Sequence, residues 1–165
     1  FVKNIAKDLG LEFIHKKVDI KSSAANGLSI EEIARAARYK FFKEAGEKLR
    51  AGVIATGHTL DDQAETVLMR VIKGASLKGL VGISPLRSEG DLRVIRPLIE
   101  LEKREIVDHL DRLEIPYKID HTNLEPIYFR NIVRNEIIPL LEKYNPRLKR
   151  ALFGPGQRAA LAAYE

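Results

Sequence analysis

The chain has 165 residues, no cysteine and a formal net charge of +5. This length predicts one domain, or one domain with a short tail. The absence of cysteine excludes disulfides, thiolate metal sites and thiol catalysis within these residues, and it fits a cytoplasmic protein. No apolar run approaches the roughly 20 residues that cross a membrane, so we expect no membrane partner. The mild positive charge fits polyanionic partners without singling out nucleic acid.

The chain opens on a helical pattern. Residues 1–9 place apolar groups at helical spacing, and Gly10 follows as a natural C-terminal cap. Residues 11–20 are short, β-prone and partly alternating, which predicts a strand. Residues 22–28 are polar and contain an Asn-Gly turn signal, which predicts a loop.

A capped helix and an apolar strand follow. Ser29 and Glu32 have the spacing of a capping box, which opens a helix that should run to about Leu49. Residues 52–56 form a short, continuous apolar run. Such a run is typical of a parallel strand that is covered on both faces.

The middle of the chain continues the alternation. A helix is expected over residues 60–72, with Thr59 as its N-cap and Asp62 at its third position. Residues 74–86 predict a Gly-rich loop. Residues 93–98 predict a short extended segment that leads into a turn.

The last third is mainly helical in pattern. Residues 102–113 are amphipathic, and residues 114–129 are mostly loop. A further helix is predicted over residues 131–144, where Pro139 should kink or end it. Residues 151–165, rich in Ala and Gly, are interpreted as a tail or the start of a linker.

The order of these elements predicts an α/β fold, with a parallel sheet flanked by helices and followed by a helical segment. Ligands of such sheets bind at the carboxyl ends of the strands. Thr56, Gly57 and His58 form one such end. Gly57 allows a ligand to approach the backbone closely, and the following helix offers free N–H groups.

Two carboxylates follow this strand end. Asp62 and Glu65 are three apart and face the same side of the predicted helix, so they could bind Mg²⁺ or an ammonium group. The alternative is structural. In that case Asp61 and Asp62 only cap the helix, Glu65 is solvated and His58 is a turn residue.

Three basic groups could meet phosphates. Arg35 and Arg38 are three apart, and Arg130 and Arg134 are four apart with Asn131 between them. Guanidinium groups suit phosphate binding, although each pair could equally be a solvated helix face.

The third basic group is a loop with Lys73 and Lys78 among Gly74, Gly79 and Gly82. It could follow an RNA backbone or cover the site, but it lacks the Walker spacing and could be a plain connection.

Several segments, in a fixed order, resemble the catalytic domain of the tRNA(Ile)-lysidine synthetase family. These segments are 29–42 (SIEEIARAARYKFF), 54–80 (IATGHTLDDQAETVLMRVIKGASLKGL), 95–98 (IRPL) and 120–139 (DHTNLEPIYFRNIVRNEIIP). The His-x-x-x-Asp-x-x-Glu-Thr segment is shared by related PP-loop ATPases that modify RNA. The Asp-x-Thr-Asn…Arg-Asn-x-x-Arg…Pro block is more specific to the lysidine enzymes.

The resemblance implies a Rossmann-like PP-loop fold of the adenine nucleotide alpha-hydrolase type. Residues 1–150 would be an incomplete catalytic domain, with its sheet part at about 1–98 and its helical part at about 99–150. It also implies a cytoplasmic ligase that uses ATP and Mg²⁺. The enzyme would adenylate the wobble cytidine of tRNA(Ile) and let free L-lysine displace AMP, and a second copy of the chain is a further candidate partner.

The resemblance also suggests roles for the candidate residues. Asp62 and Glu65 would hold the lysine or a metal, and Arg130 and Arg134 would meet phosphate or the adenylated intermediate. The nucleotide would lie near Thr56, Gly57, His58, Arg35 and Arg38. The RNA substrate would meet Asn131, Lys73 and Lys78.

The chain departs from the family in lacking its Ser-Gly-Gly-x-Asp-Ser phosphate loop, which we expect before residue 1. The chain alone is therefore expected to be inactive. Two alternatives stay open at this point. One is a related tRNA thiolase, which the absence of cysteine disfavours, and the other is a non-catalytic RNA-binding derivative of the fold.

Overall fold

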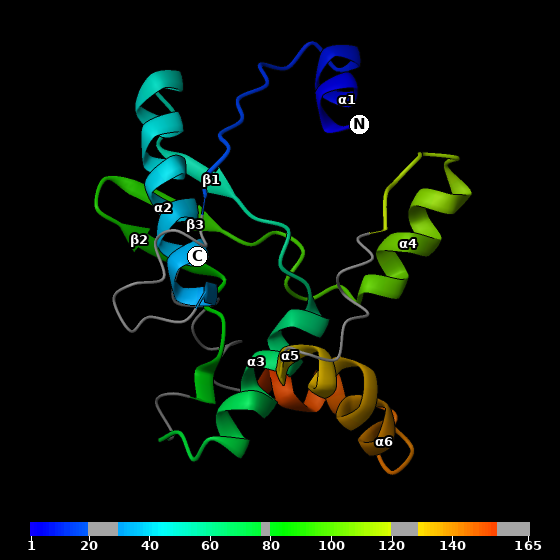
Figure 1. Ribbon diagram of the computed structural model, residues 1–165. Helices are drawn as coiled ribbons and strands as arrows, with labels where there is room; N and C mark the ends of the chain where they lie inside the picture. The colour runs from blue at the N-terminus through cyan, green and yellow to red at the C-terminus, as the bar shows by residue number, and fades with distance from the viewer. Residues whose placement is uncertain (20–29, 77–79, 120–128, 155–165) are drawn as a thin grey trace. The chain divides into compact units, whose positions relative to one another are not determined.

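The computed structural model describes residues 1–19, 30–76, 80–119 and 129–154. The chain forms two compact units (Figure 1). The first consists of residues 1–54 and 90–92, and the second of residues 55–89 and 93–165. The predicted loop at 22–28, the N-cap Ser29 and Lys78 lie outside the described residues, as do the last eleven residues of the predicted tail.

The first unit contains the two helices that the apolar spacing predicts. Helix α1 spans Val2–Asp8, and Gly10 follows it with a φ of 66°. A glycine in this left-handed conformation is the common end of a helix, so the predicted cap is confirmed. Helix α2 spans Ile30–Leu49 and ends where the sequence predicts.

The strand predicted over residues 11–20 is wrong for the part that the structure describes. Residues 11–19 have no regular secondary structure. A strand requires a neighbouring strand for its backbone and a covered face for its apolar side chains. Here Leu11 is 62% exposed, and Phe13 and Val18 are exposed too. Local β-propensity alone therefore misled the prediction.

Within the described residues, three short strands form a sheet. Strands β1 (Val53–Ala55), β2 (Leu86–Glu89) and β3 (Leu92–Ile95) pair in the order β1-β3-β2, with one parallel pair. β1 and β3 match the predicted extended segments, and the α/β class is confirmed. The expected cover on both faces of β1 is wrong, because β1 is an edge strand with two exposed residues.

Strand β2 was missed because it belongs to a hairpin. It connects to β3 through a tight turn at Gly90, which has a φ of 61°. Its residues show little alternation between apolar and polar side chains, and three of its four positions are exposed. A hairpin of this kind is set by its turn and its partner strand more than by its own apolar pattern.

The helices of the second unit follow the predicted spans. Helix α3 spans Leu60–Ile72 and α4 spans Lys103–Arg112, both with a capping box at the start. The helix expected at 131–144 consists of α5 (Phe129–Ile132), the π-helical turn η4 (Val133–Ile137) and α6 (Ile138–Glu142). The helix therefore does not end at Pro139, and a widened turn lies just before the proline that was expected to kink or end it. A last helical stretch covers residues 148–154.

Helix α3 packs on this helical segment, and the two lie side by side in Figure 1. Ala64 and Leu68 of α3 meet Val133 and Ile138 in one apolar cluster. A second cluster joins Leu60 to other buried apolar groups, namely Ile99 and Phe153. Burial of these side chains fixes α3 against the segment that carries the arginine pair.

The loop after α3 is anchored by a buried glutamine. The Gln63 amide donates to the Val81 carbonyl at 2.9 Å and accepts from the Ile83 N–H at 2.6 Å. A Cβ at Gly82 would come within 2.5 Å of the Gln63 side chain, and its φ of 74° also favours glycine. Gln63 therefore connects residues 81–83 to the first turn of α3.

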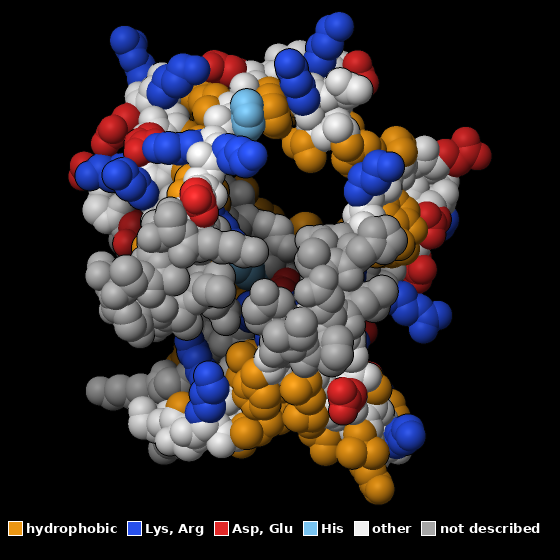
Figure 2. All heavy atoms as spheres, in the orientation of Figure 1, with side chains coloured by type: hydrophobic (Ala, Val, Ile, Leu, Met, Phe, Trp, Pro, Cys, Tyr) orange, Lys and Arg blue, Asp and Glu red, His pale blue; other side chains and the backbone are white. Residues whose placement is uncertain are grey.

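The basic residues do not gather in one place on the face that Figure 2 shows. Lys and Arg side chains are scattered there among acidic ones, while apolar side chains gather over the helices of the second unit. Within the described residues, no helix is both long and apolar enough to cross a membrane.

Candidate active site

The start of α3 is built by two residues that cap each other. The Thr59 N–H donates to Asp62 Oδ2 at 2.9 Å, and the Asp62 N–H donates to Thr59 Oγ1 at 3.4 Å. This is the capping box that the sequence predicts. One oxygen of Asp62 is thus used by the helix start.

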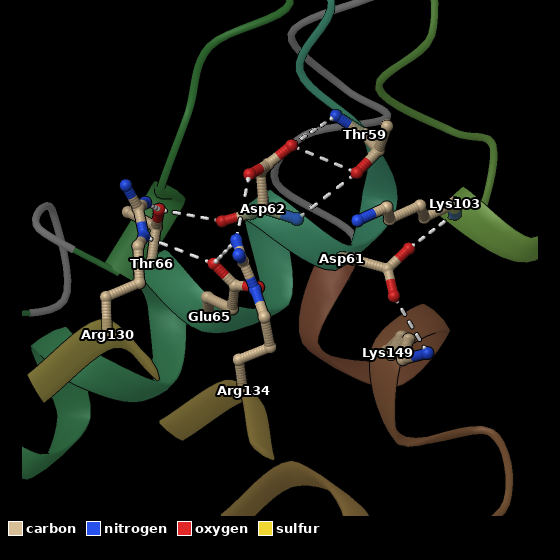
Figure 3. A network of polar contacts seen from close by, with 9 residues as sticks. All are labelled: Thr59, Asp61, Asp62, Glu65, Thr66, Lys103, Arg130, Arg134 and Lys149. Carbon is tan, nitrogen blue, oxygen red and sulfur yellow. Dashed lines mark hydrogen bonds and ion pairs between the residues drawn. The ribbon is translucent and has the colours of Figure 1, made fainter. Parts of the chain in front are cut away.

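Glu65 lies one turn further along α3 and is only 1% exposed. Its carboxylate accepts two hydrogen bonds from Arg134, from Nε at 2.6 Å and from Nη2 at 3.0 Å (Figure 3). The Nε of Arg130 lies 3.1 Å from its Oε2. One buried carboxylate therefore joins both arginines of the helical segment to α3.

Burial and pairing shift the pKa values of Glu65 and Arg134. Burial raises the pKa of the Glu65 carboxyl, although the hydrogen bond and charge of Arg134 and the charge of Arg130 act to lower it. The hydrogen bond to Glu65 in turn raises the pKa of Arg134. Glu65, Arg130 and Arg134 together carry one net positive charge when Glu65 is ionised, and the neighbouring Asp62 carboxylate balances it.

Arg130 makes a second contact with α3. Its Nη2 donates to Thr66 Oγ1 at 3.0 Å, and that hydroxyl donates to the Asp62 carbonyl oxygen at 2.7 Å. The chain of contacts links Arg130 to the backbone of the residue that caps the helix. The two arginines are therefore held from more than one side.

Asp62 differs from Glu65 in its exposure. Its side chain is 25% exposed, and its Oδ1 lies 3.8 Å from Arg134 Nη2. Both carboxylates, predicted on one helix face, do meet the same arginine. Asp62 is the one that retains access to solvent, so the two neighbouring carboxylates are chemically distinct.

Asp61 has a separate set of partners, which the sequence did not reveal. Its Oδ2 accepts from the Lys103 N–H at 2.6 Å, and its Oδ1 lies 2.9 Å from Lys149 Nζ. Glu142 and Glu102 also lie within 3.4 and 3.7 Å of this ammonium. These contacts join residues far apart in sequence, so no local motif could have indicated them.

The strand end before α3 is also ordered by hydrogen bonds. The Thr56 N–H donates to the Ile95 carbonyl at 3.0 Å, and Thr56 Oγ1 lies 2.9 Å from His58 Nδ1. No described atom lies within 4 Å of the Cβ that would be added at Gly57. The space beside this glycine is therefore free of described atoms, and the role of Thr56, Gly57 and His58 in binding a nucleotide stays a prediction.

Other predicted residues have different surroundings. Arg35 lies in the first unit on α2, 5.0 Å from the ring centre of Tyr39, and Arg38 lies on the same helix. Lys73 Nζ lies 5.8 Å from the ring centre of Phe129. The roles predicted for these residues stay predictions.

Asn131 lies on α5 and is buried. Its substrate-binding role also stays a prediction. Across the described ranges, no group of three or more His, Asp or Glu side chains has an arrangement that could hold a metal ion.

Comparison with known proteins places this geometry in a family. The pattern of the PP-loop domain matches residues 1–141. The chain is 41% identical over 143 residues to a tRNA(Ile)-lysidine synthase from Clostridioides difficile, which covers 86% of the chain and 30% of that relative. A tRNA(Ile)-lysidine synthase from Thermosipho africanus is 40% identical over 153 residues, covering 92% of the chain and 35% of the relative.

The fold also has a counterpart among solved structures. The U34-tRNA thiolase NcsA from Methanococcus maripaludis aligns with a TM-score of 0.69 and 23% identity, over 96% of the chain and 54% of that structure. The chain spans about a third of the length of the curated relatives it matches. With the family pattern covering residues 1–141, the chain belongs to the PP-loop domain family.

Proposed function

We propose that the protein containing this chain is a tRNA(Ile)-lysidine synthase, an ATP-dependent ligase that acts on the wobble cytidine of tRNA(Ile). Relatives of that name match most of the chain at about 40% identity. The observation that carries the proposal is the network of Asp62, Glu65, Arg130 and Arg134, which lies inside the matched segment.

The proposed reaction has two steps. The C2 carbonyl oxygen of cytidine attacks the α-phosphorus of ATP, so that a carbon–oxygen–phosphorus link forms and pyrophosphate leaves. The neutral amine of lysine then attacks C2, and the C2–O bond breaks as AMP leaves with the oxygen. The amine loses a proton to a base during this second step, because an ammonium group has no lone pair for attack.

The exposed carboxylate fits the lysine step. Asp62 retains solvent access and has one oxygen directed away from the helix cap, toward Arg134. A carboxylate in this position can accept a hydrogen bond from the substrate amine and orient it. Glu65 is enclosed by arginines, and we propose that it acts on the reaction by holding them.

The arginines fit the phosphate side of the reaction. Arg130 and Arg134 keep 34% and 28% of their side chains exposed beyond the ion pair with Glu65. Guanidinium groups held in advance of the reaction can stabilise charge that develops on the adenylate and on departing AMP. Asn131 and Lys73 are proposed to extend the substrate surface together with Lys78.

ATP is proposed to lie at the end of β1, near Thr56, Gly57 and His58, with Arg35 and Arg38 as further ligands. Mg²⁺ usually combines one or two carboxylates with substrate phosphates and waters. Asp62 suits such a site as a single carboxylate, and Mg²⁺ bound there would neutralise phosphate charge. We also propose a cytoplasmic protein whose partners are tRNA(Ile) and free L-lysine.

Transfer of labelled lysine to tRNA tests the proposal. The full-length protein is incubated with tRNA(Ile), ATP, Mg²⁺ and labelled L-lysine, with a second reaction in which ATP is left out. The proposal expects label in the tRNA only when ATP is present, together with release of AMP and pyrophosphate. A folded protein that transfers no label would exclude this function, and a nucleoside that gains sulfur in place of oxygen would indicate a thiolase.

A further inference from the structure

The helix that carries Arg134 contains an unusual turn. Val133–Ile137 is π-helical, and the Ile138 N–H donates to the Val133 carbonyl, five residues back. An α-helix would make this bond to the residue four back. Single π-helical turns are rare inside α-helices and frequently occur at functional sites.

Two buried residues of this helix are also five positions apart in the sequence. Val133 is fully buried and Ile138 is 4% exposed, and both belong to the cluster that packs on α3. In a straight α-helix, residues five apart point about 140° away from each other. The wider turn is therefore what lets both side chains face the same core.

The proline two residues after this turn gives the turn a chemical cause. In an α-helix, the N–H of residue 139 would donate to the carbonyl of Asn135. Pro139 has no N–H, and its ring would collide with that carbonyl. A widened turn just before the proline relieves the collision while the helix continues to Glu142.

The turn also sets the direction of the arginines. Arg130 lies in α5 and Arg134 in η4, and both reach the same carboxylate, Glu65 (Figure 3). If an α turn replaced the π turn, the residues before and after the turn would rotate relative to one another by about 100°, the rotation of one α-helical residue. Either Ile138 would leave the core, or the segment before it, with Arg130 and Arg134, would rotate relative to α3 by that angle.

We infer that Pro139 is a positioning residue, which maintains the π-helical turn that directs Arg134 toward Glu65. Pro139 has an exposed side chain without a charged group, so it cannot form an ion pair with the polar network itself. Its effect on the reaction would pass through Arg134. This inference rests on the proposed function only where activity is measured, because the contact between Arg134 and Glu65 can be followed without any reaction.

The test compares Pro139→Ala in the full-length protein with a matched control, Pro146→Ala. Pro146 lies in a turn outside the π-helical segment. The first readout is the ¹⁵N spectrum of labelled arginine, in which the Nε–H of Arg134 reports its 2.6 Å bond to Glu65. The second is the rate of lysine transfer to tRNA(Ile), measured for Pro139→Ala, Arg134→Ala and the double variant.

The inference expects Pro139→Ala to stay folded, with a Tm set by two opposing effects: alanine suits a helix better than proline, whereas a shifted Arg134 weakens the ion pair with buried Glu65. The Arg134 signal should shift, kcat should fall at least about tenfold, and the double variant should be no slower than Arg134→Ala. Pro146→Ala should leave the signal unchanged. An unchanged Arg134 signal in Pro139→Ala, or additive losses in the double variant, would overturn the inference.

The two proposals fail in different ways. If the wild-type protein transfers no lysine, the proposed function is wrong, while the Arg134 signal still decides whether Pro139 positions the arginine. If transfer occurs and Pro139→Ala is as fast as the wild type, the function stands and the positioning role is wrong.

Discussion

Two neighbouring aspartates at the start of α3 have different surroundings. Asp61 contacts Lys149 and the first N–H of α4, whereas Asp62 caps its own helix and faces Arg134. The sequence Asp61-Asp62 gives no sign of this division, because both residues suit a helix N-terminus equally well. The partners that separate them come from distant parts of the chain.

Asp61→Asn is expected to destabilise the protein more than Asp62→Asn. Without the Asp61 charge, the nearest carboxylates to the Lys149 ammonium, which is 17% exposed, are those of Glu142 at 3.4 Å and Glu102 at 3.7 Å. This loss should cost about 1–3 kcal/mol. Asparagine at residue 62 can still accept the hydrogen bond from Thr59. Urea denaturation of both variants measures the difference in the free energy of unfolding. Equal stabilities would contradict the different roles of the two aspartates.

Glu65→Gln should be the most destabilising of the single changes in this network. Removing one charge of a buried ion pair leaves its partners without compensation, and a loss of about 3 kcal/mol is expected. The enclosed position of Glu65 between Arg130 and Arg134 is the reason. Chemical denaturation checks it, with the exposed pair member Glu89→Gln as control. A loss no larger than in the control would show that the pair contributes little.

At the scale of elements, α3 connects the site to the core. Its first turn holds the capping box, its middle pairs with arginines, and its apolar face packs on the helical segment. These features could be predicted in part. The bounds of α3 and its cap follow from residues within a few positions of each other, while the π turn depends on how the segment packs.

Thr59→Ala is expected to weaken the start of α3. The variant removes the hydroxyl that accepts the Asp62 N–H, and loss of such a cap costs about 1 kcal/mol. Thr59→Ser keeps the hydroxyl and should retain most of the stability. Thermal melts compare the Tm values of the two variants. A serine variant as unstable as the alanine variant would argue against the role of the Thr59 hydroxyl as a cap.

Lys149 should make stability depend on alkaline pH. Burial opposes its charge, but the hydrogen bond and charge of Asp61, with Glu142, raise the pKa of Lys149 above its ordinary value of 10.5. The raised pKa means that the charged form favours the folded state. Its contribution is therefore complete below pH 10.5 and is lost as the pH rises through the higher folded-state pKa.

The difference in Tm between the wild type and Lys149→Met measures this contribution. It should be constant between about pH 7 and 9 and shrink above about pH 10.5. A difference that stays the same over the whole range would mean that the Lys149 charge does not link α3, α4 and the helical stretch 148–154.

At the scale of the whole molecule, the sequence anticipated the α/β class and most helices, and four of its candidate site residues, Asp62, Glu65, Arg130 and Arg134, contact one another. Local patterns carried those predictions, as the spans of α2 and α3 illustrate. The failures involved distant partners. The strand expected at 11–20 lacked a neighbour, β2 depended on its hairpin, and Lys149 was indicated by no motif.

The central proposal is that the Asp62 side chain serves the reaction in addition to capping the start of α3. Its most direct test is lysine transfer to tRNA(Ile) by the full-length Asp62→Asn variant, measured beside its Tm. We predict that transfer falls at least about 100-fold, because the amine loses its orienting carboxylate, while the Tm stays within a few degrees of the wild type. A variant that still transfers lysine at the wild-type rate, or one that loses activity only because it unfolds, would contradict the account.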